Sequence, residues 1–203
     1  MSLAVMVSVP LALVSGLALT LLNGPFLEDL VATFNQALAQ LEQDLQQEGS
    51  GELAFNSLAV PQVAALLATG NAVIALLSLM LGRYWQAALY NPGGFGDEFR
   101  ALKLPAGAVM AMAFVAAALW LMGPDWRVWS AAAVLPLTIV GFALVHAYAA
   151  HSNKGVAWLT LMYVLWIVLD IVKWVWVGCV VIDAFTDFRA RWASPTGKGS
   201  GGA

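Results

Sequence analysis

The sequence predicts an all-α protein, a polytopic transmembrane helical bundle of about five crossings with one amphipathic helix outside the membrane. Hydrophobic residues make up 61% of the chain and charged residues only 10%, whereas soluble domains are about 25% charged. The apolar residues form five long runs, and a polar insert separates the first run from the second. A soluble fold of 203 residues could not bury so much apolar surface, so the excess must face lipid.

The apolar runs set the predicted spans, because about 20 mostly apolar residues cross the hydrocarbon core. They cover residues 3–22, 60–81, 105–122, 128–149 and 156–182. With the polar insert 23–59 they form a single transmembrane domain, 1–193, followed by a flexible Gly/Ser-rich tail, 194–203. No Lys or Arg precedes the first run, so we expect a membrane segment there and not a cleaved signal peptide.

Small residues recur at every fourth position of the first two runs. They are Ser8, Ala12, Gly16 and Thr20 on the first run, and Ala64, Ala68 and Ala72 on the second. Such stripes let helix backbones approach closely in lipid, where little hydrophobic force drives helices together. They predict a packed bundle.

The last two runs are less regular. Pro136 predicts a kink in the fourth run, since proline removes one helical hydrogen bond. As one helix the fifth run, 156–182, would be roughly 40 Å long, more than the core requires. It must therefore tilt, break or project into water.

The polar insert contains an amphipathic helix. Its apolar residues recur every three or four positions: Phe26, Leu30, Phe34, Leu38, Leu41 and Leu45. The insert carries six acidic residues and no basic ones, whereas helices that bind anionic lipid are normally rich in Lys and Arg. We expect it to pack on the rim of the bundle or on a partner; the plainer alternative is a solvated connecting helix.

The second connection, 82–104, is the candidate partner-docking surface. It is the most basic connection, its aromatic residues suit the headgroup zone, and Pro followed by two Gly predicts a tight turn. The docking residues are Arg83, Tyr84, Trp85, Tyr90, Asn91, Pro92, Gly93, Gly94, Phe95 and Arg100.

The basic residues of the connections divide equally between the two sides if the chain crosses five times. The balance shifts if the fifth run turns back near residues 170–173, because Arg189 and Arg191 then join the side that holds Lys154. On this interpretation that side is cytoplasmic and the acidic insert is outside.

Three polar residues inside the runs are the candidate ligand-binding groups: Asn71, Asp170 and Lys173. Charges at this depth are costly and suggest function, but Asp170 and Lys173 share a helical face and could simply neutralise each other or mark a turn near water. Asn71 could equally bond a neighbouring helix. Asp187 and Arg191 are four apart and could pair on a continuing helix.

The sequence lacks the residues that several other functions would require. A net charge of −3 without a basic cluster argues against nucleic acid. Cys179 is the single cysteine, and His146 and His151 have no ligand-spaced carboxylate, so we expect no metal site and no cofactor. No catalytic motif occurs, and we expect no enzyme.

Two stretches resemble a known family. The run from Leu79 to Arg100 (LMLGRYWQAALYNPGGFGDEFR) and the closing 182–189 (IDAFTDFR) look like a proteobacterial branch of the YybS-like membrane proteins, a domain of unknown function. The resemblance covers the chain from about Asn23 onward, and the Tyr-Asn-Pro-Gly-Gly-Phe stretch is its specific part. Family members carry further membrane segments before the acidic insert, so the resemblance implies a short form or a fragment.

That family is more distantly similar to the substrate-binding subunits of energy-coupling-factor transporters and to the rod-shape protein MreD. The resemblance implies a multi-pass protein of the bacterial inner membrane, with the lipid bilayer and a membrane-protein partner or energising module around it. The first hypothesis is a transporter-like small-molecule binder. The alternative is a structural scaffold in cell-envelope assembly, with the acidic insert as its contact element.

Overall fold

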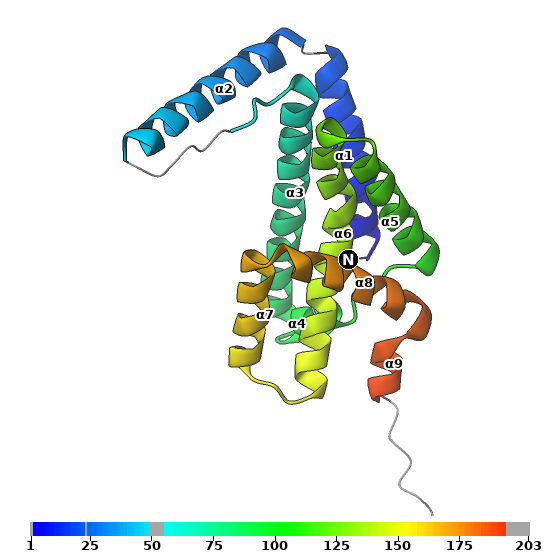
Figure 1. Cartoon of the computed structure of the whole chain (residues 1–203). Coiled ribbons are helices and arrows are strands. Elements are labelled where there is room, and N and C mark those ends of the chain that lie inside the picture. Colours follow the sequence, from blue (N-terminus) through cyan, green and yellow to red (C-terminus); the bar gives the residue numbers. More distant parts are fainter. Residues whose placement is uncertain (1, 23, 49–54, 194–203) are drawn as a thin grey trace, which may run out of the picture. The chain divides into compact units, whose positions relative to one another are not determined.

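The computed structural model describes residues 2–22, 24–48 and 55–193, and these ranges contain helices and no strand (Figure 1). The predicted all-α class is confirmed. The helices are α1 (Ser2–Leu22), α2 (Gly24–Gln47), α3 (Val60–Tyr90), α4 (Gly94–Arg100), α5 (Ala106–Leu121), α6 (Pro124–His151), α7 (Val156–Val168), α8 (Asp170–Thr186) and α9 (Phe188–Ala193). The predicted flexible tail, 194–203, lies outside the described residues.

The helices mark the chain as a membrane protein. Among the described residues, α3 and α6 are each long and apolar enough to cross a bilayer. The bent pairs α1–α2 and α7–α8 raise that number to four if each pair makes one crossing. Helix α5 is apolar but has only 16 residues, so a crossing by α5 stays a prediction.

Two helices extend beyond their predicted spans. Helix α3 continues past residue 81 to Tyr90, so the second connection begins later than predicted. A single Gly82 costs a helix only about 1 kcal/mol, and Arg83 forms an ion pair with Glu98 of α4. Helix α6 begins at Pro124, where the fixed φ of proline suits a first helical position, and it remains helical through Pro136.

The fifth run breaks, which was one of the three predicted alternatives. Helices α7 and α8 meet at a bend of 115°, visible in Figure 1. Leu169 between them has extended backbone angles, φ −112° and ψ 109°. Its N–H still bonds the Leu165 carbonyl at 2.9 Å, and its own carbonyl accepts the Val172 N–H at 3.0 Å. One residue therefore makes the turn while its own N–H and C=O stay hydrogen-bonded.

Contacts divide the chain into two compact units, and α1, α3, α5 and α6 contribute to both. Unit 1 takes Met1–Met6, Ser78–Phe114 and Val134–Ala203, and unit 2 takes Val7–Leu77 and Val115–Ala133.

The core of unit 2 is built on the predicted small-residue stripes. Ala64, Ala68 and Ala72 are buried on α3, and Ser8, Ala12 and Gly16 are buried on α1. A Cβ added at Gly16 would overlap the Trp129 ring and approach the Ala68 Cβ to 3.0 Å. Glycine is therefore required where α1, α3 and α6 approach one another.

The acidic insert belongs to unit 2 and packs by its first turn. Leu27 of α2 is fully buried in the cluster of Ala64, Ala65, Ala68 and Trp129. Farther along α2, Phe34 and Leu41 are exposed. The start of α2 thus packs on the bundle, but through Leu27, which is not part of the predicted apolar face; Phe26 of that face is 55% exposed.

Candidate functional site

The break in the fifth run places Asp170 and Lys173 in the first turn of α8. Lys173 Nζ donates to Asp170 Oδ1 at 2.6 Å, and the Asp170 side chain is 89% exposed. The same ammonium lies 5.6 Å from the centre of the Trp166 ring on α7. An acidic residue suits the positive end of a helix. The two charges neutralise each other at the bend, which was one of the alternatives predicted for this pair.

Asn71 lies on the part of α3 that belongs to unit 2. Its side chain is exposed, while Ala68 and Ala72 on the neighbouring face are buried. Asn71 therefore points away from the packed core. The three residues predicted to bind a ligand lie in different units, and none of them lines a cavity described below.

The predicted docking surface forms one contiguous group in unit 1. Arg83 donates to Glu98 and to Gln86, and the hydrogen bond from Arg83 holds the pKa of Glu98 below its usual range. The Tyr84 ring packs edge-on against Phe95, with centroids 5.8 Å apart. This framework joins the end of α3 to α4.

The turn between α3 and α4 depends on its glycines. Gly93 has φ +88°, a conformation that other residues rarely adopt, and a Cβ at Gly94 would collide with the Asn91 side chain. Trp85 and Tyr90 are 60% and 83% exposed on the last turns of α3. The predicted tight turn is confirmed, and it leaves large aromatic side chains available for a partner or for lipid headgroups.

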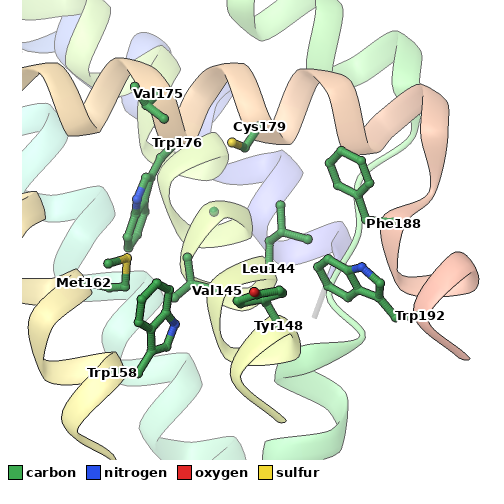
Figure 2. A pocket seen from close by; sticks show the side chains of 11 residues that line it. Leu144, Val145, Tyr148, Trp158, Met162, Val175, Trp176, Cys179, Phe188 and Trp192 are labelled. Carbon is green, nitrogen blue, oxygen red and sulfur yellow. The ribbon is translucent and has the colours of Figure 1, made fainter. Parts of the chain in front are cut away.

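A cavity of about 300 Å³ in unit 1 is the strongest candidate binding site. Figure 2 shows the side chains that line it. They come from four helices: Gly141, Leu144, Val145 and Tyr148 of α6, Trp158 and Met162 of α7, Val175, Trp176 and Cys179 of α8, and Phe188 and Trp192 of α9. The bend at Leu169 is what brings α8 and α9 beside α6.

Aromatic packing beside this cavity joins α6, α7 and α8. Phe142 of α6 contacts Tyr163, Trp166 and Trp176, with ring centroids 4.9, 5.2 and 4.6 Å away. His146 Nε2 and the Tyr163 hydroxyl form a hydrogen bond of 2.8 Å. Aromatic pairs at these distances contribute about 0.5–1.5 kcal/mol each beyond burial. The packing joins α6, α7 and α8, and Trp176 extends it to the wall of the cavity.

The cavity is almost wholly apolar with few polar atoms. The Trp158 indole N–H is buried and has no hydrogen-bond partner in the described chain. Outside the cavity wall, the Lys154 ammonium lies 4.0 Å from the Trp158 ring centre and 5.4 Å from that of Tyr148. Such a space suits an apolar or aromatic molecule that offers one acceptor to the indole.

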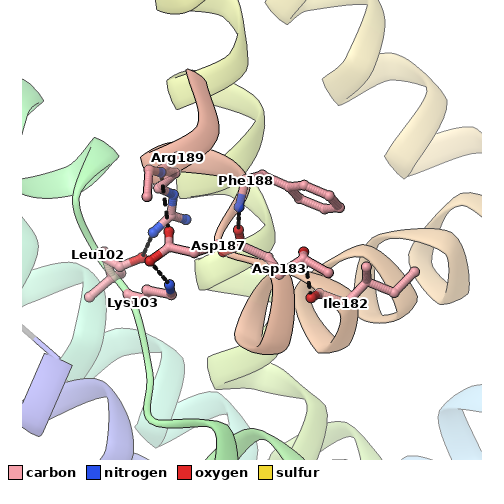
Figure 3. A network of polar contacts seen from close by, with 9 residues as sticks. Leu102, Lys103, Ile182, Asp183, Asp187, Phe188 and Arg189 are labelled. Carbon is pink, nitrogen blue, oxygen red and sulfur yellow. Dashed lines mark hydrogen bonds and ion pairs between the residues drawn. The ribbon is translucent and has the colours of Figure 1, made fainter. Parts of the chain in front are cut away.

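A polar network fixes the end of α8 and the start of α9 (Figure 3). Asp187 adopts a left-handed conformation, φ 50°, so the helix does not continue and the predicted Asp187–Arg191 pair is wrong. Asp187 instead binds Lys103 at 2.7 Å. That bond, and one from the Ala190 N–H, lower the pKa of Asp187. Buried Asp183 accepts the Phe188 N–H at 2.9 Å.

Sequence reasoning missed every residue of the cavity. Tyr148, Trp158 and Trp192 stand near the ends of apolar runs, where aromatic residues are common whether or not they bind anything. Only the bend at Leu169 brings Trp192 to within 5.5 Å of Tyr148, measured between ring centroids. The sequence did offer a turn near residues 170–173 as one alternative, but it did not indicate which side chains such a turn brings together.

No protein family model, curated protein or solved structure matches the chain. Within the part of the chain that the structure describes, no group of three or more His, Cys, Asp or Glu side chains could hold a metal ion.

Proposed function

We propose that this chain is a non-enzymatic, multi-pass protein of the bacterial inner membrane that binds a small apolar molecule within its helices. The observation that carries the proposal is the aromatic cavity of about 300 Å³. Its volume lies at the lower end of the range for small-molecule sites. The role agrees with the substrate-binding subunits that the YybS-like resemblance implies.

The test fills the cavity with a larger side chain and measures which bound small molecules the protein then loses. Val145 lines the cavity, so Val145→Trp should occupy part of it. Val164 on α7 is 49% exposed and outside the cavity, so Val164→Trp is the matched control. Each protein is purified in mild detergent and its bound small molecules are identified by mass spectrometry. A molecule kept by wild type and by Val164→Trp, but lost by Val145→Trp, supports the proposal. Identical profiles for all three proteins refute it.

We further propose that the surface from Arg83 to Arg100 docks an energising partner. Trp85 is 60% exposed there, and aromatic and Arg side chains are enriched at interfaces. Affinity purification from native membranes should recover an ATPase-bearing transport module. Trp85→Ser should weaken that recovery, whereas Trp126→Ser, which changes an exposed Trp of α6, should not. Recovery of envelope-assembly proteins without an ATPase would contradict the transporter role.

A structural scaffold in envelope assembly is the second candidate function, favoured by α2. Phe26, Phe34 and Leu41 are 55%, 42% and 47% exposed along one helix, and such a row can dock on a partner. Under this alternative, Leu38→Ser with Leu41→Ser abolishes a cellular phenotype, whereas Val145→Trp leaves it unchanged. If Val145→Trp abolishes the phenotype and the double serine variant leaves it unchanged, the small-molecule binder is favoured.

A further inference from the structure

A second cavity of about 340 Å³ in unit 1 has a basic lining. Its charged or titratable side chains are Arg100 of α4, His151 at the end of α6 and Arg189 of α9. The remaining lining residues are three alanines and Trp192, and no carboxylate is among them. Two guanidinium groups and an imidazole around one space are the donor set that recognises a phosphate.

Arg189 has hydrogen-bonding capacity left over. Its Nη1 donates to the Leu102 carbonyl at 2.6 Å (Figure 3). Nε and Nη2 are buried and have no hydrogen-bond partner in the described chain. Burial lowers the pKa of this guanidinium, although the charges of Asp183 and Asp187 oppose that effect. A buried cation with unused donors gains from any oxyanion that reaches it.

The neighbouring carboxylates already have partners. Asp187 binds Lys103 at 2.7 Å. Asp97 accepts from Nη2 of Arg100 at 2.6 Å, so a phosphate would use the other N–H groups of that guanidinium. Asp183 accepts the Phe188 N–H. Helices α8 and α9 are thus held in place without using Nε or Nη2 of Arg189.

Trp192 lines both the basic cavity and the aromatic cavity. Its ring is stacked on His151 and on Phe188, with centroids 5.7 and 6.0 Å away. His151 belongs to the basic cavity and Phe188 to the aromatic one. A single ligand that passes Trp192 would place a charged group on one side and an apolar chain on the other.

The geometry points to an amphiphile with a phosphate head as the ligand: the phosphate binds Arg100, His151 and Arg189, and the part of the apolar tail next to the head lies in the aromatic cavity. This inference rests on the proposed function, because it assigns a substrate class to the same site. The phosphate could come from a lipid or from free phosphate, and the test separates these sources.

The experiment uses the full chain in phosphatidylcholine nanodiscs and three probes. Tritiated octadecyl phosphate carries head and tail, tritiated octadecanol carries the tail alone, and inorganic phosphate is the competitor that carries the head alone. Scintillation proximity measures saturable binding above that of empty nanodiscs. We expect octadecyl phosphate to bind about tenfold or more tightly than octadecanol, with inorganic phosphate displacing it only at large excess.

Variants locate the head group. Arg189→Gln should remove the preference for octadecyl phosphate, whereas Arg191→Gln, which changes an exposed arginine of the same helix, should keep it. If Arg189→Gln does not fold, His151→Gln must reduce the preference for octadecyl phosphate instead. The phosphate site is refuted if whichever of these two variants folds still binds octadecyl phosphate with the full preference.

The remaining outcomes of the binding experiment distinguish failure of the phosphate head from failure of the amphiphile as a whole. Equal affinity of wild type for octadecyl phosphate and octadecanol refutes the phosphate head and leaves the proposed function standing. Binding of neither probe above empty nanodiscs refutes the amphiphile, and the proposed function then depends on the Val145→Trp test alone. Displacement by inorganic phosphate at equal concentration refutes the amphiphile and assigns the basic cavity to free phosphate.

Discussion

The charged pair at the bend, Asp170 and Lys173, makes a quantitative prediction about depth. Helix α7 has 13 residues, a rise of about 20 Å. If α7 enters at the membrane boundary, the bend lies about 10 Å short of the far boundary of a roughly 30 Å core. A lone charge inside the core costs about 2.5–3.5 kcal/mol at the centre. Neutralising one partner should therefore lower the free energy of unfolding by about 2 kcal/mol.

Neutralising both partners should restore most of that loss, because no unpaired charge is left in the core. The chain supplies a matched control in Asp97 and Arg100 of α4. That pair has the same 2.6 Å separation and i, i+3 spacing, with side chains 78% and 39% exposed against 89% and 42%. It lies outside the predicted spans, so its single neutralisations should each cost less than about 1 kcal/mol.

The assay is a double-mutant cycle for each pair, Asp→Asn with Lys→Gln or Arg→Gln, measured by reversible unfolding in bicelles titrated with SDS. The reasoning requires strong coupling in the Asp170–Lys173 cycle and almost none in the Asp97–Arg100 cycle. Small and additive effects in both cycles would refute it, because they would place the bend of α7 and α8 in water.

Two further predictions concern packing and pH. Gly16→Ala should destabilise unit 2 by about 1–3 kcal/mol, because the added methyl overlaps the Trp129 ring. Gly70→Ala meets nothing within 4 Å and should be neutral or stabilising. Thermal unfolding should show a lower melting temperature for Gly16→Ala only, and equal changes in the two variants contradict the prediction. The Lys103 ammonium depresses the pKa of Asp187, so this carboxylate stabilises the fold above its unfolded pKa, and the gain is lost as pH falls through the lower folded value. Asp187→Asn should flatten the fall in melting temperature from about pH 5 to about pH 2; an unchanged slope means that the ion pair does not contribute.

Composition and periodicity were enough to predict the fold class and the packed stripes. Four of the five apolar runs each contain one helix and the fifth contains two, and the spacing of Ala64, Ala68 and Ala72 predicted the buried face of α3. These features follow from local sequence, because a helix repeats every 3.6 residues and lipid demands apolar side chains.

The cavities could not be predicted, because they depend on how one residue turns. Asp170 and Lys173 suggested a turn near residues 170–173, but without Pro or Gly at Leu169 the sequence did not show in which direction α8 and α9 would run. Asp170 and Lys173 were predicted to bind a ligand because charges in apolar runs suggest function. The structure shows them as an exposed pair at the start of a helix, and the space that could hold a ligand lies among side chains of ordinary type.

The bend also predicts the topology of the last segment. The Trp192 ring of α9 lies against His151 and Tyr148 at the end of α6. We therefore expect the turn after α6 and helix α9 to lie on the same side of the membrane, with α7 and α8 as a re-entrant pair. In a Cys179→Ser background, Gly155→Cys and Ala190→Cys should both react with a membrane-impermeant maleimide from that side. Asp125→Cys, at the other end of α6, should react from the opposite side. Labelling of Gly155→Cys and Ala190→Cys from opposite sides would mean that α7 and α8 together cross the membrane, and it would separate Trp192 from both cavities.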